Sequence, residues 1–293
     1  MTHENFAMSL PPPRSVLIAL LDAVKDHPDD DTPRLVLADW LDEQDNELDA
    51  ARAKNIRKDI ARERGALPPA ANMELRVQAT LFQRCLGLLA AFPISGEFAR
   101  GLPHVTIDGP ALLQPAFRPL FASEEFAFVQ FVQLNNAGGP RMEAMAALPE
   151  FRHVAGLGVY PFNPLGTGSA AKFFGSPNLT GLRQIAFRSV QPGAVGVQAL
   201  AANPALARLR KLNLAHNKLV DKALAALAAG KHLSALEVLD LSDNNIGDAG
   251  AESLAASTAF PHLRELNLRE CSRITDRGKQ LLRDKFGDRV KLD

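Results

Sequence analysis

The last third of the sequence repeats itself with a fixed period of 27 residues. Three consecutive segments, 209–235, 236–262 and 263–289, superpose without a gap. Each opens with Leu-x-x-Leu-x-Leu-x-x, followed by Asn in the first two segments and by Cys in the third. A unit this short cannot bury its apolar side chains alone, so consecutive units must stack and share one continuous core. The period therefore restricts this part of the chain to an elongated array of stacked units.

The first half of each unit has the alternation of a short β-strand. In the first of the three units, the side chains of Leu212 and Leu214 share one face, because strand side chains alternate with a period of two. Asn217, Asn244 and Cys271 then occupy the position where the chain turns off the strand. A buried Asn satisfies backbone groups that such a turn leaves unpaired. We therefore assign these three residues to a structural turn.

The second half of each unit has the spacing of a helix. Asp221 and Asp248 stand just before the apolar helical pattern. A carboxylate in this position accepts hydrogen bonds from the free N–H groups of the first turn. We therefore predict that the two aspartates are N-caps of helices over residues 222–229 and 249–256.

The repeat continues upstream in weaker form. The segment 182–208 keeps the 27-residue step, and three degenerate units precede it from residue 102 onward. In one of them, Gly156 and Gly158 replace the residues expected on the strand. We predict a solenoid of about seven units over residues 98–293.

The repeated motif resembles the leucine-rich repeat. Units of 27 residues with a helical second half resemble its ribonuclease-inhibitor-like class. This resemblance implies an α/β solenoid whose parallel strands line a concave face and whose helices lie outside. Extended concave surfaces of this kind are what solenoids use to bind partners.

A different, helical pattern precedes the repeats. We expect a disordered tail over residues 1–14 and a small all-α domain over residues 15–97. The domain contains the stretch HPDDDTPRLVLADWLDE. In this stretch, Thr32 or Asp31 can cap a helix whose first residue is Pro33, where the missing N–H of proline has no cost.

That stretch resembles the hallmark of the short bacterial repeat-companion domain, DPDDDTPRLVYADWLDE, and departs from it at His27 and Leu37. Residues 53–69 (AKNIRKDIARERGALPP) and 98–107 (FARGLPHVTI) resemble two further segments of the same family. Members carry this helical domain before leucine-rich repeats. The resemblance thus implies the same order in this chain.

The charges are balanced overall but not locally. The 33 Lys and Arg residues equal the 33 Asp and Glu residues, which argues against a nucleic-acid partner because phosphate binding needs a clustered cationic surplus. Between residues 22 and 49 there are eleven acidic residues and two basic ones, and residues 52–64 hold six basic and two acidic ones. These segments either compensate each other within one domain or form a partner surface.

Other functional classes lack their sequence marks. No apolar run reaches the roughly 18 residues of a membrane span, and no secretory signal is present, so we expect a cytoplasmic protein. The seven histidines lack zinc-ligand spacing, and Cys85 and Cys271 fit structural positions. No nucleophile elbow, P-loop or dinucleotide fingerprint occurs. We therefore expect a monomer that is not an enzyme and has no cofactor or metal.

The residues beside the buried strand positions should point onto the concave face. Phe131 and Tyr160 are then exposed aromatic residues and Arg188 an isolated cation, which are frequent anchors of protein interfaces. The candidate partner-binding residues are Phe131, Gln133, Asn135, Tyr160, Gln184, Arg188, Lys211, Asn213, Asp240, Glu265, Asn267 and Arg269.

Two functional hypotheses follow. In the first, the chain is a non-enzymatic protein–protein interaction module that presents its concave face to a protein partner of unknown identity. The helical domain then caps the solenoid and covers its first strand edge. In the alternative, the acidic helical domain is the docking element and the repeats are a scaffold.

Overall fold

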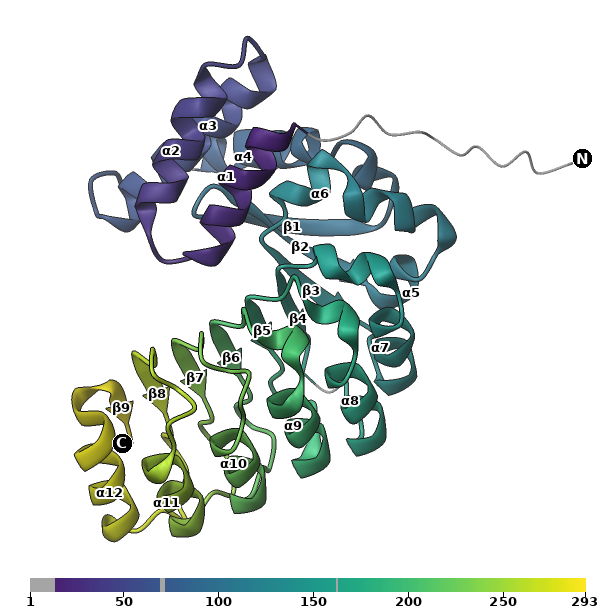
Figure 1. The fold of residues 1–293 in the computed structure, drawn as a ribbon. Helices are drawn as coiled ribbons and strands as arrows, with labels where there is room; N and C mark the ends of the chain where they lie inside the picture. Colours follow the sequence, from purple (N-terminus) through teal and green to yellow (C-terminus); the bar gives the residue numbers. More distant parts are fainter. Residues whose placement is uncertain (1–13, 69–71, 162) are drawn as a thin grey trace, which may run out of the picture.

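The chain folds into a curved solenoid with a group of helices at its N-terminal end (Figure 1). The structure is a computed structural model, and it describes residues 14–68, 72–161 and 163–293. The tail predicted for residues 1–14 lies outside the described residues, apart from Arg14. Strands line the inner side of the curve and the helices of the repeats line the outer side, which is a mixed α/β architecture.

The described residues form one nine-stranded sheet in which neighbours in space are also neighbours in sequence. Every pair is parallel except β1 with β2. Lys211 pairs with Val238 and Val238 with Glu265, so the register advances by one unit per strand. The strands are β1 (Ile94–Ala99), β2 (Leu102–Asp108), β3 (Phe131–Asn135), β4 (Gly156–Val159), β5 (Gln184–Ala186), β6 (Lys211–Asn213), β7 (Val238–Asp240), β8 (Glu265–Asn267) and β9 (Val290–Lys291).

Helices return the chain along the outer side of the curve. In three units a short 3₁₀ turn that starts with proline leads toward the next strand, at Pro149, Pro177 and Pro204. Proline suits the first position of such a turn because its missing N–H would be unpaired there. The outer elements are α5 (Gly109–Leu112), η2 (Pro115–Ala122), α6 (Glu124–Phe128), α7 (Gly139–Ala146), η3 (Pro149–His153), α8 (Thr167–Phe174), η4 (Pro177–Leu179), α9 (Gly193–Ala202), η5 (Pro204–Leu206), α10 (Asp221–Ala228), α11 (Asp248–Ala256), α12 (Asp276–Phe286) and η6 (Gly287–Arg289).

Phenylalanines fill the core of the degenerate units. Phe121, Phe151, Phe173 and Phe187 are buried one unit after another, with ring centroids 6.4, 6.2 and 5.5 Å apart. Each ring occupies more volume than a leucine, so fewer core positions suffice. The weak Leu pattern upstream of residue 209 therefore reflects a change of core residue, and the strand register continues through it.

The N-terminal helices are α1 (Ser15–Asp26), α2 (Asp31–Asp42), α3 (Glu47–Glu63) and α4 (Asn72–Leu86), followed by the 3₁₀ turn η1 (Gly87–Ala91). A separate apolar cluster holds α1–α3 together, in which Leu21, Leu37 and Ile56 are buried. Phe128 of α6 completes this cluster. The helices are thus packed onto the first repeat as well as onto each other.

The predicted start of α2 is wrong by two residues. The helix begins at Asp31, and its N-cap is Asp30, whose carboxylate accepts a hydrogen bond from the N–H of Thr32 at 2.8 Å. Asp30 takes this role because its oxygen reaches the N–H two residues ahead without leaving the turn. Pro33 therefore lies inside the first turn of the helix.

A β-hairpin of β1 and β2 forms the first edge of the sheet, where we predicted that helices would cover the first strand. β1 runs antiparallel to β2 and spans the predicted domain boundary at residues 97 and 98. The two residues of its turn, Arg100 and Gly101, both have positive φ, at 50° and 81°. Two such residues make the tight turn that matches the twist of paired strands. This turn reverses the chain direction after β1 and leads directly into β2, the strand of the first repeat.

The two aspartates predicted as N-caps bind the next repeat instead. Helices α10 and α11 begin at Asp221 and Asp248 themselves. The carboxylate of Asp221 accepts from the N–H of Gly247 at 2.7 Å, and that of Asp248 accepts from the N–H of Thr275 at 2.8 Å. The capping prediction is wrong because stacking brings a neighbouring backbone N–H within reach of each carboxylate.

The turn asparagines also bind across the repeats. Asn217 accepts hydrogen bonds from the N–H groups of Val190 and Gln191, both at 2.8 Å. Asn244 accepts from the N–H groups of Asn217 and Leu219, at 3.1 and 2.9 Å. Each amide NH₂ group also donates to carbonyl oxygens of its own unit and of the preceding one. Cys271 has only one weak donor at this position, directed at the Leu241 carbonyl, at 3.4 Å.

Replacement of Asn244 by Ala should destabilise the fold strongly. It leaves the buried N–H groups of Asn217 and Leu219 without an acceptor and removes the amide donor from the carbonyl oxygens of Leu214 and Leu241. We therefore expect a loss of about 2–4 kcal/mol in the free energy of unfolding. Chemical denaturation measures this loss. The neighbouring Asn245 is exposed, and Asn245→Ala should change stability by less than about 0.5 kcal/mol. Equal losses in both variants would contradict the role of the turn.

Candidate interaction surface

The inner side of the solenoid carries aligned rows of polar side chains. In β5–β8 the central residue is buried and both neighbours are half-buried. Parallel pairing sets Asn213 beside Asp240, and the Asn213 amide donates to the Asp240 carboxylate at 3.1 Å. The predicted residues that are half-buried on this concave face are Gln133, Asn135, Gln184, Lys211, Asn213, Asp240, Glu265 and Asn267.

Three other predicted residues lie at the edge of this face. Tyr160, Arg188 and Arg269 follow the last residues of β4, β5 and β8 and are exposed. Tyr160 is 44% exposed, the most of any aromatic side chain among the exposed hydrophobic residues that the structure describes. These three side chains form a rim at the carboxyl-terminal ends of the strands, beside the concave face.

Phe131 is not exposed, and the prediction that it is an exposed anchor is wrong. Only 9% of it is accessible, because its ring lies over Gly156 and Gly158 of β4. A Cβ atom at Gly156 would lie 2.6 Å from the ring, and one at Gly158 2.8 Å from it. His104 of β2 flanks the ring, with centroids 5.5 Å apart. The two strand glycines, which the sequence showed as departures from the repeat, provide the space for this ring.

The end of α1 and the loop that follows it contact the segments that lead into β5 and β6. Asp26 accepts hydrogen bonds from Arg183 at 2.9 Å and from Arg208 at 2.7 Å. Asp29 accepts one from Lys211 at 2.7 Å. These five residues are called the docking seam below. Lys211, one of the predicted partner-binding residues, is therefore paired within the chain.

Two arginines shape the loop that carries the seam aspartates. Arg34 is fully buried and donates to the carbonyl oxygen of Asp30 at 3.1 Å. Burial, together with the nearby charge of Arg100, lowers the pKa of Arg34 to about 10. Arg100 donates to the carbonyl oxygen of Pro28 at 2.8 Å and pairs with Asp31. The HPDDDTPR stretch and the FARG stretch, far apart in sequence, thus build one loop.

The two arginines of the docking seam hold the Asp26 carboxylate in its charged form. Burial alone would raise the pKa of Asp26, but the hydrogen bonds and charges of Arg183 and Arg208 outweigh it and lower this pKa below its ordinary value. The Arg183 side chain is only 6% exposed. Asp26 therefore neutralises a guanidinium that water reaches poorly.

Sequence reasoning did not single out four of the five seam residues. Asp26 was one of eleven acidic residues in its segment, with nothing to separate it from the rest. Asp29 belongs to the acidic run of the HPDDDTPR stretch, which favoured helix capping and not an ion pair with a repeat. Arg183 and Arg208 precede their strands and so fall outside the outward-pointing positions of the repeat. Arg183 directly follows the first leucine of its unit, but Arg210 and Arg264 do so as well, so this position does not separate it from them.

Other acidic residues of the segment also pair within the chain. Asp39 and Asp42 both accept hydrogen bonds from Arg57, at 2.7 and 2.6 Å. Asp49 is buried and pairs with Arg52 at 3.0 Å. For these residues, the acidic and basic segments compensate each other inside the helical group.

No metal or thiol chemistry is evident in the part of the chain that the structure describes. Within it, no three His, Cys, Asp or Glu side chains are grouped to hold a metal ion. Burial raises the pKa of the Cys85 thiol, and it raises that of Cys271 to about 11. Both thiols are thus weak nucleophiles near neutral pH. None of the described helices combines the length and apolar character needed to cross a membrane.

Comparison with known families identifies the repeats. Residues 208–228, 232–255 and 261–282 match the family model described as Leucine Rich repeat. These segments contain β6, β7 and β8 and the beginnings or whole of the helices that follow them. No curated protein matches the chain. The matches support a leucine-rich repeat protein, and such repeats are generally protein-interaction modules.

Loss of the Asp26 carboxylate should destabilise the chain. Asp26→Ala leaves the buried guanidinium of Arg183 without its partner, so we expect a loss of about 3 kcal/mol in the free energy of unfolding. Hydrogen exchange of α1 should rise in parallel. Asp39→Ala breaks a pair in which the Asp39 side chain is 70% exposed, and it should cost less than about 1 kcal/mol. A loss for Asp26→Ala as small as this control would contradict the seam.

The same carboxylate predicts an acid sensitivity of defined sign. Because the pKa of Asp26 is lowered in the folded chain, its stabilisation is present above the unfolded pKa of about 4 and is lost as pH falls through the folded value. Asp26→Asn should therefore lower stability at pH 7 and shrink the difference in stability between pH 7 and pH 3. Denaturation curves at both pH values measure this, and an unchanged difference would refute it.

Proposed function

We propose that this chain is a non-enzymatic protein-interaction module that binds a protein partner on the concave face of β6–β8. The observation that carries this proposal is the aligned array on those strands, in which two half-buried side chains flank each buried leucine. An array of this kind offers hydrogen-bonding groups at regular spacing on a rigid sheet, which suits recognition of another folded surface.

The docking seam supports this part of the face in particular. Lys211 of β6 is the last sheet residue that the α1–α2 loop contacts through an ion pair among the described residues. Val238, Asp240, Glu265 and Asn267 lie on the strands beyond it. The helices stand on the same side of the sheet as this surface (Figure 1). They border the surface and limit how a partner can approach.

The rim adds the side chains that dominate interface energies. Tyr160 and the arginines Arg188 and Arg269 are exposed beside the concave face. Tyr and Arg contribute strongly to binding when a partner excludes water from them. Asp240 places negative charge at the centre of the face, whereas the Glu265 carboxylate pairs with Lys291 at 2.7 Å. We therefore expect a partner with a cationic group opposite β7.

The structure offers less to the alternative, in which the acidic helices are the docking element. Asp26, Asp29, Asp39, Asp42 and Asp49 all pair with cations of this chain. Ion pairs within the chain therefore neutralise most of the negative charge of these five side chains. We infer that residues 15–97 are a repeat-companion domain whose role is to hold the start of the solenoid, which the contacts of Arg100 with the α1–α2 loop support.

A charge placed on the concave face should weaken partner binding. Val238 is half-buried at its centre, so Val238→Lys should weaken the Kd for a captured partner at least about tenfold, and Arg188→Ala should weaken it about threefold. Titration calorimetry with the purified partner measures both.

Matched controls lie away from this face. Val195 is 54% exposed on α9, on the outer side, and Val195→Lys adds the same charge there. Arg118 is exposed in η2, and Arg118→Ala is the control for Arg188→Ala. Binding that survives Val238→Lys but is lost in Val195→Lys would assign the interaction to the outer surface and overturn the proposal.

A further inference from the structure

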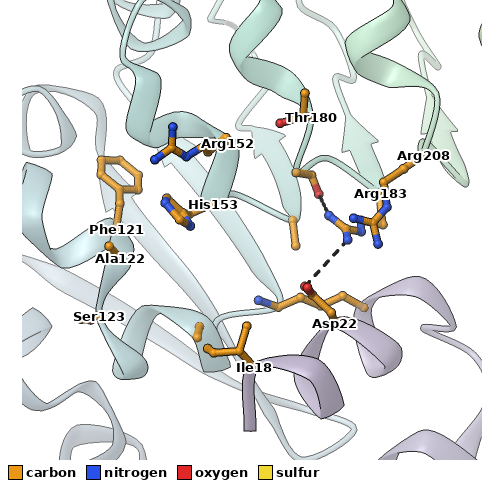
Figure 2. Close-up of a pocket in the computed structure, with 14 residues that line it drawn as sticks. Ile18, Asp22, Phe121, Ala122, Ser123, Arg152, His153, Thr180, Arg183 and Arg208 are labelled. Carbon is orange, nitrogen blue, oxygen red and sulfur yellow. Dashed lines mark hydrogen bonds and ion pairs between the residues drawn. The ribbon is translucent and has the colours of Figure 1, made fainter. Parts of the chain in front are cut away.

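A cavity of about 420 Å³ lies behind the docking seam, between α1 and the segments that lead into β4 and β5. Figure 2 shows Ile18 and Asp22 of α1 on one wall and Arg152 and His153 on the wall opposite. Arg183 closes a third side. The cavity is therefore assembled from the N-terminal helices and the repeats together, and neither part contains it alone.

Lys25 lines this cavity, and it is unusual there because its side chain is both charged and mostly buried. The side chain is buried, with 7% of the residue exposed. Among the described residues it has no hydrogen-bond or ion-pair partner. Burial lowers the pKa of Lys25 to about 8, an effect that Asp22 opposes and Arg183 reinforces. The Lys25 ammonium is not among the fully buried polar atoms that lack a partner in the described residues. The mostly buried side chain therefore ends at the cavity, where an anion can contact its charge.

Arg183 is a second cation at this cavity whose hydrogen-bond donors are not all paired. Its Nε donates to Asp26 at 2.9 Å, and one terminal nitrogen donates to the carbonyl oxygen of Gly181. The other terminal nitrogen is buried without a hydrogen bond among the described residues and lies 3.8 Å from the Asp22 carboxylate. Two nine-tenths buried cations thus line one cavity with donors to spare.

The charges around the cavity leave a positive excess. Lys25, Arg152, Arg183 and Arg208 line it, against the carboxylates of Asp22 and of Asp26 beside it. Two positive charges therefore remain unbalanced at neutral pH. A phosphate monoester carries about 1.5 to 2 negative charges there and offers three acceptor oxygens, whereas a carboxylate carries one charge and two oxygens.

We propose that this cavity binds the phosphate group of a small molecule, with Lys25 and Arg183 as its principal ligands. The apolar side chains of Ile18 and Phe121 line the same cavity and accommodate an apolar portion of the ligand. His153 adds a hydrogen-bonding group on the opposite wall. Because α1 and the repeats both contribute, binding strengthens the contact between the helices and the solenoid.

The test uses the full chain with inorganic phosphate and phenyl phosphate at constant ionic strength. We expect saturable binding of phenyl phosphate by calorimetry and a rise in melting temperature, with benzoate binding at least about tenfold more weakly. Inorganic phosphate should compete for the same site. Absence of saturable binding of either phosphate up to about 10 mM would overturn the proposal, because a site of this charge should bind more tightly.

Variants separate specific binding from general attraction. Lys25→Met should weaken phenyl phosphate binding at least about tenfold. The ligand-free chain should stay at least as stable as the native one, because a charge on a mostly buried side chain is removed. Lys218 is exposed, and Lys218→Met should leave the affinity unchanged.

A second pair of variants covers the opposite wall. Arg152 and His153 are both exposed at the surface, so Arg152→Ala and His153→Ala should fold normally and each weaken binding about threefold. Equal affinities for the native chain, Lys25→Met and Arg152→Ala would place any bound phosphate elsewhere and refute the assignment.

Discussion

Each repeat of this chain leaves backbone groups that only a neighbouring repeat can satisfy. Asn217 completes the turn of the unit before it by accepting from Val190 and Gln191, and Asn244 does the same one unit later. Asp221 and Asp248 repeat this dependence at the starts of the outer helices. Because buried N–H and carbonyl groups are costly when unpaired, the units are stable only as a stack. Stacking in turn fixes the parallel strands side by side and creates the concave face.

The contact between the N-terminal helices and the repeats also depends on groups that need a partner from elsewhere in the chain. Here the groups are charged side chains and not backbone amides. Arg183 is nearly buried at the start of β5, and it depends on Asp26 of α1 for its partner. The loop that follows Asp26 is in turn held by Arg34 and Arg100. A buried guanidinium without a counter-charge is strongly unfavourable. These ion pairs, together with the apolar contacts of Phe128 with α1–α3, therefore set the position of the helices relative to the solenoid. That position also decides which part of the concave face the helices border.

The same contact produces two surfaces of different character. On the concave face beyond the docking seam, half-buried polar side chains stand in rows over buried leucines, as in a surface for a large partner. Behind the seam, Lys25 is enclosed without a partner among the described residues, at the wall of a cavity sized for a small molecule. Phe131 belongs to neither surface, because the glycines of β4 let its ring lie flat against the sheet.

The sequence by itself determined the repeat, its period and the register of β5–β8, since the period of the leucines is a local property that stacking only extends. It also indicated which strand residues point to the concave face. It could not show that Phe131 is covered or that Lys211 is paired, because those outcomes depend on Gly156, Gly158 and Asp29 from other parts of the chain. Nor could it separate Asp26 from its ten acidic neighbours in the segment. Only the tertiary structure decided these points, because burial and ion pairing arise between segments that the fold brings together.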